Sequence, residues 1–83
     1  MKITLKLYAT LTDYLPAGSH GNKVELDIAE SDTVAAVLGR FNMPERLVKL
    51  VLINGAFVAP ADRPDRRLAE GDHLAVWPPV AGG

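Results

Sequence analysis

Two segments near the start of the chain alternate between apolar and other residues with a period of two. The apolar positions are Ile3, Leu5 and Leu7 in the first segment, and Val24, Leu26 and Ile28 in the second. This period places successive side chains on opposite faces of a strand, so each segment is expected to bury one face. The connection is rich in Gly, Ser and Asn, with one short helical turn expected over residues 11–15. The two strands are predicted to form a hairpin, and their oppositely charged outer faces favour cross-strand pairing.

A helix is predicted after this hairpin. Its apolar stripe, at positions i, i+3, i+4 and i+7, is Val34, Val37, Leu38 and Phe41. Thr33 is expected to cap its N-terminus, and Pro44 is expected to prevent its continuation. Gly39 lies inside the stripe, where glycine lowers helix stability by about 1 kcal/mol relative to alanine. The stability of the main helix is therefore expected to depend on its packing against the rest of the domain.

Three further strands are expected in the second half of the chain. Residues 47–53 form a nearly unbroken apolar run that ends at Asn54-Gly55, a two-residue hairpin turn signal. Residues 56–60 return as a short strand, and their proline places it at a sheet edge. Residues 73–77 alternate again. The order ββαβββ predicts the α+β class, with one main helix packed on a mixed sheet of four to five strands.

Length and composition restrict the function. The 83 residues are enough for one domain, and 48% of them are apolar, which allows a modest core. A net charge of −1 gives no electrostatic footprint for nucleic acid or a membrane surface. Without cysteine the chain has no disulfide and no thiolate nucleophile. The N-terminus does not resemble a signal peptide, and a cytoplasmic protein is expected.

The polar candidates for a site are few. Arg63, Arg66 and Arg67 cluster among acidic residues, and either a solvated loop or a docking contact for an acidic partner would explain them. His20 and His73 are far apart in sequence and lack acidic partners at ligand spacing, so surface histidines are expected rather than a metal site. No nucleophile motif or phosphate-binding glycine loop is present. The chain is expected to hold no cofactor and to catalyse nothing alone.

The last seven residues, "WPPVAGG", restrict the backbone strongly. Pro78 and Pro79 hold φ near −65° and favour an extended chain before them. Gly82 and Gly83 have no Cβ atom, so the end of the chain could enter a narrow slot. A frayed end without a role is the alternative. We expect one domain over residues 1–83 with a flexible tail over residues 78–83.

Three stretches together resemble the MoaD/ThiS family of ubiquitin-like sulfur carriers, over the whole chain. They are "LYATLTDYL", the central hairpin "LINGAFV" and the ending "LAEGDHLAVWPPVAGG". The resemblance implies a β-grasp fold. The "PPVAGG" ending is more similar to the small subunit of molybdopterin synthase than to the thiamine sulfur carrier.

The resemblance also implies the chemistry of the tail. The α-carboxylate of Gly83 would be adenylated by a separate ATP-dependent, ubiquitin-activating-like enzyme. A sulfur donor such as a cysteine desulfurase or a rhodanese-like protein would then convert it to a thiocarboxylate. The tail would insert together with this group into the large subunit of molybdopterin synthase. Its inserting residues would be Pro78, Pro79, Val80, Ala81 and Gly82. A thiamine or tRNA-thiolation carrier, a ubiquitin-like modifier and an inert interaction module remain open alternatives.

In a β-grasp fold the apolar run would lie beside the last strand. The face away from the helix would then carry Leu50, Leu52, Ala75 and Trp77. An exposed apolar patch beside the tail would be typical of a protein-binding surface. The alternative is a central strand that is covered on both sides within the monomer.

Overall fold

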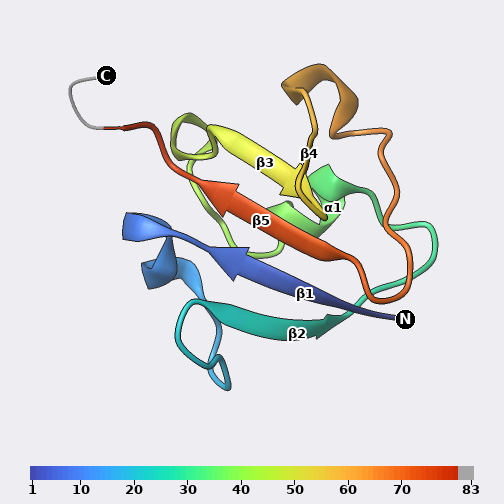
Figure 1. Ribbon diagram of the computed structural model, residues 1–83, viewed down its shortest axis with the longest axis horizontal. Coiled ribbons are helices and arrows are strands. Elements are labelled where there is room, and N and C mark those ends of the chain that lie inside the picture. The colour runs from blue at the N-terminus through green and yellow to red at the C-terminus, as the bar shows by residue number, and fades with distance from the viewer. Residues whose placement is uncertain (81–83) are drawn as a thin grey trace.

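The computed structural model describes residues 1–80, and within them five strands form one mixed sheet (Figure 1). The strands are β1 (Lys2–Leu7), β2 (Lys23–Asp27), β3 (Leu50–Ile53), β4 (Ala56–Phe57) and β5 (His73–Trp77). Their order across the sheet is β2-β1-β5-β3-β4. The central pair, β1 and β5, is parallel, whereas the other neighbouring pairs are antiparallel. The predicted hairpin and the order ββαβββ are confirmed.

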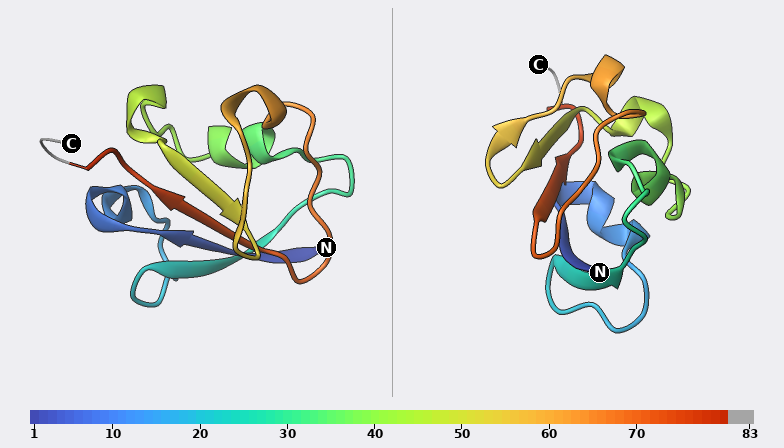
Figure 2. Two further views of the ribbon diagram at one scale, coloured as in Figure 1. Left: turned by 45° about the horizontal axis from the view of Figure 1, so that its top comes forward. Right: turned by 90° about the vertical axis from the view of Figure 1, so that its right-hand side faces the viewer.

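The main helix lies on one face of this sheet. The helical segments are α1 (Val34–Gly39) and three 3₁₀ turns, η1 (Ala9–Tyr14), η2 (Glu45–Leu47) and η3 (Pro60–Asp62). Figure 2 shows α1 stacked on one side of the sheet, so the other side, here called the outer face, is not covered by it. No helix within residues 1–80 has the length and apolar character needed to cross a membrane.

The helix α1 is shorter than its apolar stripe. It begins after Thr33, whose Oγ1 accepts a 3.2 Å hydrogen bond from the N–H of Ala36, as the sequence predicts. It ends at Gly39, two residues before Phe41, and Asn42 then takes a left-handed φ of 57°. The prediction that Phe41 is part of the helix is therefore wrong, and its side chain is only half-buried. The buried members of the stripe are Val34, Val37 and Leu38.

One hydrophobic core fills the space between α1 and the sheet. Its strand residues are Ile3, Leu5, Leu7, Leu26, Val51, Ile53, Leu74 and Val76. Each fully buried aliphatic side chain of this size stabilises the fold by about 1.5–3 kcal/mol relative to an exposed one. The apolar residues of the alternating pattern therefore face the core, and the residues between them lie on the outer face.

The predicted hairpin turn between β3 and β4 is confirmed. Asn54 and Gly55 both have positive φ angles, 50° and 85°, which is the backbone of a type I′ turn. The strand before it begins only at Leu50, because residues 45–47 form η2. The strand after it, β4, lies at the sheet edge as predicted, but it ends at Phe57 rather than at residue 60, because Pro60 begins η3.

Charge pairing between β1 and β2 is confirmed at one end only. Lys2 lies opposite Asp27, and their side chains form an ion pair with 3.2 Å between Nζ and Oδ1. At the other end Lys6 lies opposite Lys23, which is a like-charge pair. Exposed pairs of this kind contribute little, about 0–1 kcal/mol. The register therefore depends on the buried face rather than on these charges.

Arg63 is a structural residue, which corrects the expectation of a purely solvated arginine loop. Its guanidinium donates to three backbone carbonyls, those of Val58 (3.4 Å), Val48 (3.3 Å) and Lys49 (3.2 Å). Partial burial lowers its pKa from the usual value, but a guanidinium stays charged in proteins. The other two arginines of the cluster are exposed. Arg63 thus joins the η3 loop to the start of β3.

Candidate functional site

The four residues of the predicted patch share the outer face of the sheet. Leu50 lies opposite Trp77 and Leu52 opposite Ala75 in the antiparallel pair of β3 and β5. The residues that alternate with them are buried on the helix side. Leu50 is 37% exposed, and the other three are half-buried. The outer face of these strands is therefore partly open to solvent rather than fully covered by other parts of the described chain.

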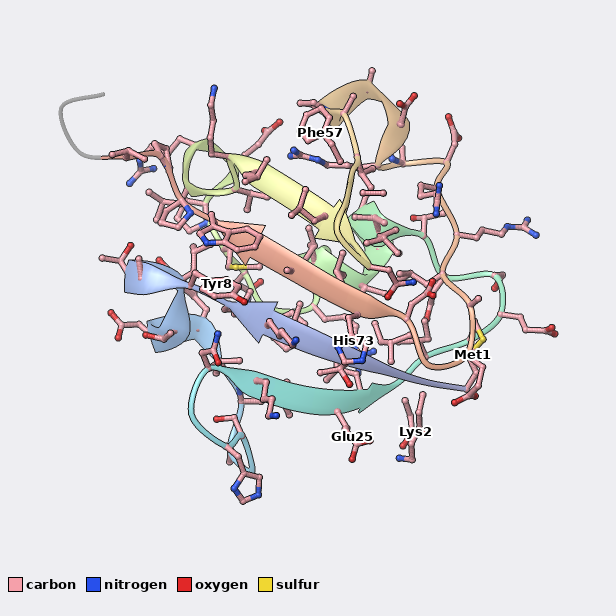
Figure 3. The ribbon with its side chains drawn as sticks, viewed as in Figure 1. Met1, Lys2, Tyr8, Glu25, Phe57 and His73 are labelled. Atoms are coloured by element: carbon pink, nitrogen blue, oxygen red, sulfur yellow. The ribbon has the colours of Figure 1, made fainter. Side chains whose placement is uncertain are left out.

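Two aromatic residues that were not among the predicted patch residues extend this patch. Tyr8 continues the alternation of β1 by one residue and stacks on Trp77, with ring centroids 4.1 Å apart. Phe57 lies opposite Leu52 on the edge strand β4 and is 60% exposed. Figure 3 shows the two side chains at opposite ends of the patch, Tyr8 beside β1 and Phe57 on the β4 side. We call the set Tyr8, Leu50, Leu52, Phe57, Ala75 and Trp77 the outer patch.

The sequence held a signal for each missed residue. Tyr8 follows Thr4 and Lys6 at a spacing of two residues, so the period-two pattern already places all three on the outer face. Phe57 follows from the two-residue turn, because that turn sets the register in which residue 57 faces Leu52. Tyr8 is found when the alternation of β1 is extended by one residue, and Phe57 is found when the register of the turn is carried into β4.

The chain leaves the sheet directly beside the outer patch. The carbonyl of Trp77 accepts a 3.0 Å hydrogen bond from the N–H of Lys49, and the N–H of Tyr8 donates to the carbonyl of Val76 at 3.1 Å. After this point Pro78 is half-buried, whereas Pro79 and Val80 are exposed. Figure 1 shows the chain running outward from the end of β5. The backbone is therefore held by neighbouring strands up to the first proline.

The remaining predicted tail residues, Ala81, Gly82 and Gly83, lie outside the described residues. Beside the base of the tail is a surface groove of about 670 Å³. Its apolar lining is Leu50, Trp77, Pro78, Pro79 and Val80. Two cationic residues, Arg46 and Lys49, complete the lining. We call it the tail-base groove.

Both histidines line one surface pocket, although they are far apart in the sequence. A hollow of about 480 Å³ is lined by both His20 and His73 and also by Glu25. Glu25 and His73 lie on the same face because β1 lies between β2 and β5, with Thr4 opposite both of them (Figure 3). His20 lines the hollow from the loop before β2. Within residues 1–80, no group of three or more His, Cys, Asp or Glu side chains is placed to hold a metal ion. The hollow is a polar region of the outer face that is lined by two imidazoles and one carboxylate.

Comparisons with known proteins identify the fold. The family model described as "ThiS family" matches residues 6–83. None of the curated protein sequences matches the chain significantly.

Three solved structures share the architecture. SAMP1 from Haloferax volcanii is 27% identical, with full coverage of both chains and a TM-score of 0.69; another crystal structure names it small archaeal modifier protein 1. A putative molybdopterin converting factor subunit 1 from Pyrococcus furiosus is 22% identical over 95% of this chain and 98% of that one, with a TM-score of 0.69. A chain in the complex of subunits 1 and 2 of molybdopterin-converting factor from Helicobacter pylori is 16% identical over the full length of both chains, with a TM-score of 0.61. The predicted ubiquitin-like β-grasp fold is confirmed.

Proposed function

The chain belongs to the ThiS family, and from this we propose that it is a sulfur carrier whose reactive group is the C-terminal carboxylate of Gly83. The observation that carries the proposal is the junction of the outer patch with the tail. An apolar surface suited to a protein partner leads, through Trp77, directly into a proline pair and a Gly-Gly ending. A carrier needs both parts, because one binds the enzyme and the other reaches its active site.

The chemistry starts from an unreactive group. A carboxylate is ionised at neutral pH, with a pKa of about 3.3–3.7, and an ionised carboxylate resists nucleophilic attack. A separate activating enzyme would let a carboxylate oxygen attack the α-phosphorus of ATP, releasing pyrophosphate and leaving an acyl-adenylate. A sulfur nucleophile from a donor protein would then displace AMP. Attack by the terminal sulfur of a donor persulfide releases AMP and leaves an acyl disulfide with the donor cysteine. A second thiol then cleaves that S–S bond, releasing the thiocarboxylate and leaving the donor cysteine in a disulfide, so one difficult step is divided into easier ones.

The dimensions of the tail suit delivery into a buried site. From Val80 outward an extended chain spans roughly 13 Å, at about 3.3 Å per residue. The proline pair restricts the chain before that point and so lowers the entropy cost of insertion. Glycine at the tip removes the side chains that would otherwise need space. The body of the protein can then remain outside while the carboxylate enters.

We propose molybdopterin biosynthesis as the pathway, with the chain as the small subunit of molybdopterin synthase. The "PPVAGG" ending supports this, as does the likeness in fold to the subunit 1 proteins of Pyrococcus and Helicobacter. The partners would be the activating enzyme, a cysteine desulfurase or rhodanese-like sulfur donor, and the synthase large subunit. The Helicobacter structure is a complex of subunits 1 and 2, so a subunit 1 protein of this fold does bind a second subunit.

A ubiquitin-like modifier is the second candidate function. The observation in its favour is the 27% identity with SAMP1, whose other crystal structure names it a modifier. The activating step would be the same, but a lysine amine rather than sulfur would attack the activated Gly83 carboxyl and form an isopeptide bond. A third candidate is a sulfur carrier for thiamine synthesis or tRNA thiolation, in which the activation of Gly83 and the transfer of sulfur would be the same.

The test is intact mass spectrometry after incubation with ATP, the activating enzyme from the same genome and a sulfur donor. Exchange of one oxygen for sulfur raises the mass by about 16 Da. Deletion of Gly83 should abolish this gain without unfolding the domain. A gain equal to another protein's mass, located on a lysine, would favour the modifier. An unchanged mass with several activating enzymes would contradict the carrier proposal.

A further inference from the structure

Two cations flank the tail-base groove. Arg46 and Lys49 line it together with the apolar residues of the tail base, and among residues 1–80 no carboxylate contributes to the lining. Both side chains are exposed. In the part of the chain that the structure describes, the one ion pair joins Lys2 to Asp27, so neither of these cations is paired there. The groove therefore combines an apolar floor with an unneutralised basic rim.

The local fold separates the charges of this segment. The 3₁₀ turn η2 carries Glu45 and Arg46 side by side in the sequence, yet Glu45 lines a different pocket, between α1 and η3. Arg46 and Lys49 are three residues apart and line the same groove. Lys49 is held there because its N–H donates to the carbonyl of Trp77 at 3.0 Å and its own carbonyl accepts from Arg63 at 3.2 Å. Backbone contacts thus keep a basic pair beside the tail.

We propose that the tail-base groove binds an acidic, partly apolar segment of the enzyme that activates the tail. Carboxylates of that segment would pair with Arg46 and Lys49, while an apolar side chain packs against Trp77. The identity of the partner rests on the proposed function; the chemistry of the groove does not.

Charge complementarity is the reason for choosing an acidic occupant. The whole chain has a net charge of −1, so its overall charge does not attract an acidic surface. A local basic rim does, and paired charges at the edge of an interface set orientation and raise the association rate. Such binding would fix the orientation of the partner at the base of the tail. At the other end of the outer patch, Phe57 shares a pocket with Arg66 and with two carboxylates, those of Asp62 and Asp65, so the charge there is mixed rather than basic.

The groove is tested first without any enzyme. Trp77 is the sole tryptophan and lies in the groove, so its fluorescence reports occupancy. A short blocked peptide of alternating Asp and Leu is titrated into the full chain, with an Asn and Leu peptide as control. We expect the acidic peptide alone to change the fluorescence, and the change to be lost in the double variant Arg46→Gln, Lys49→Gln. No response at millimolar acidic peptide, or an equal response to both peptides, would overturn the proposal.

The second test uses the activating enzyme over a salt series up to about 0.5 M NaCl. The Arg46→Gln, Lys49→Gln variant should bind at least about tenfold more weakly at low salt, with a flatter salt dependence that meets the wild-type curve at high salt. The control Lys23→Gln, Arg67→Gln removes the same charge elsewhere and should follow the wild type. Equal salt curves for all three proteins would overturn the proposal. A wild type that gains no mass with sulfur donor contradicts only the carrier function, because the peptide titration still reports on the groove.

Discussion

Tyr8 and Trp77 stack face to face, with ring centroids 4.1 Å apart and an angle of 7° between the ring planes. The two residues are at the ends of β1 and β5, the parallel pair at the centre of the sheet. The stack therefore forms where the outer patch meets the base of the tail. It restrains the rotamer of Trp77 before any partner arrives.

This stack should be measurable as a coupling energy. Tyr8→Ala and Trp77→Ala, alone and combined, form a double-mutant cycle for urea unfolding. Stacked aromatic pairs contribute about 0.5–1.5 kcal/mol beyond their buried area, so we expect coupling in that range. Additive effects of the two substitutions would mean that the stack does not stabilise the folded protein.

Trp77 should also anchor a partner. Aromatic anchors in apolar patches often contribute about 2 kcal/mol or more to binding, so Trp77→Ala should weaken binding to the activating enzyme or the synthase at least tenfold. Tyr8→Ala should weaken binding less than Trp77→Ala, since it removes one member of the outer patch and the stack but leaves the indole. If Trp77→Ala lowers the melting temperature strongly while affinity per folded molecule is unchanged, Trp77 is a core residue and not an anchor.

Arg63 should matter for stability rather than for partner binding. Arg63→Met keeps the apolar stem but leaves three carbonyls without their donor, which should cost about 1–3 kcal/mol of unfolding free energy. Arg66→Met changes an exposed arginine in the same loop and should stay within about 0.5 kcal/mol of the wild type. Denaturant unfolding measures both, and equal effects would show that the carbonyl contacts of Arg63 are not stabilising.

Two glycines should respond to alanine in opposite directions. Gly55 has a φ of 85° in the hairpin turn, so Gly55→Ala should destabilise the protein by about 1 kcal/mol or more. Gly39 ends α1, and a Cβ there would meet nothing within 4 Å, so Gly39→Ala should stabilise by up to about 1 kcal/mol. Thermal unfolding of both variants checks this. A Gly55→Ala variant as stable as the wild type would contradict the turn geometry, and a destabilised Gly39→Ala variant would contradict the argument from helix propensity.

Co-purification distinguishes the pathways. If the chain is the small subunit of molybdopterin synthase, it should elute from size-exclusion chromatography with the large subunit of its own genome, as two carriers around a large-subunit dimer. The outer patch provides an apolar surface for a lasting interface. Separate elution at micromolar concentration would favour thiamine or tRNA thiolation, or the modifier, and would leave the activation of Gly83 untouched.

Much of the fold could be predicted from short stretches of sequence, because the causes are local. The period of two in β1, the hydroxyl of Thr33 before α1 and the Asn54-Gly55 turn each act within a few residues. The end of α1 is predicted less accurately. Phe41 continues the apolar period, but the left-handed backbone at Asn42 is incompatible with a longer helix.

The sequence by itself therefore determined the strands, the helix, the faces they bury and the character of the tail. Only the tertiary structure decided which of these elements meet. Tyr8 reaches Trp77, and Arg63 reaches the start of β3, across chain separations that no local pattern encodes. For the Tyr8–Trp77 stack the physical reason is the parallel pairing of β1 with β5, which joins segments from opposite ends of the chain. That pairing is selected by the burial of the whole core rather than by any turn between the two strands.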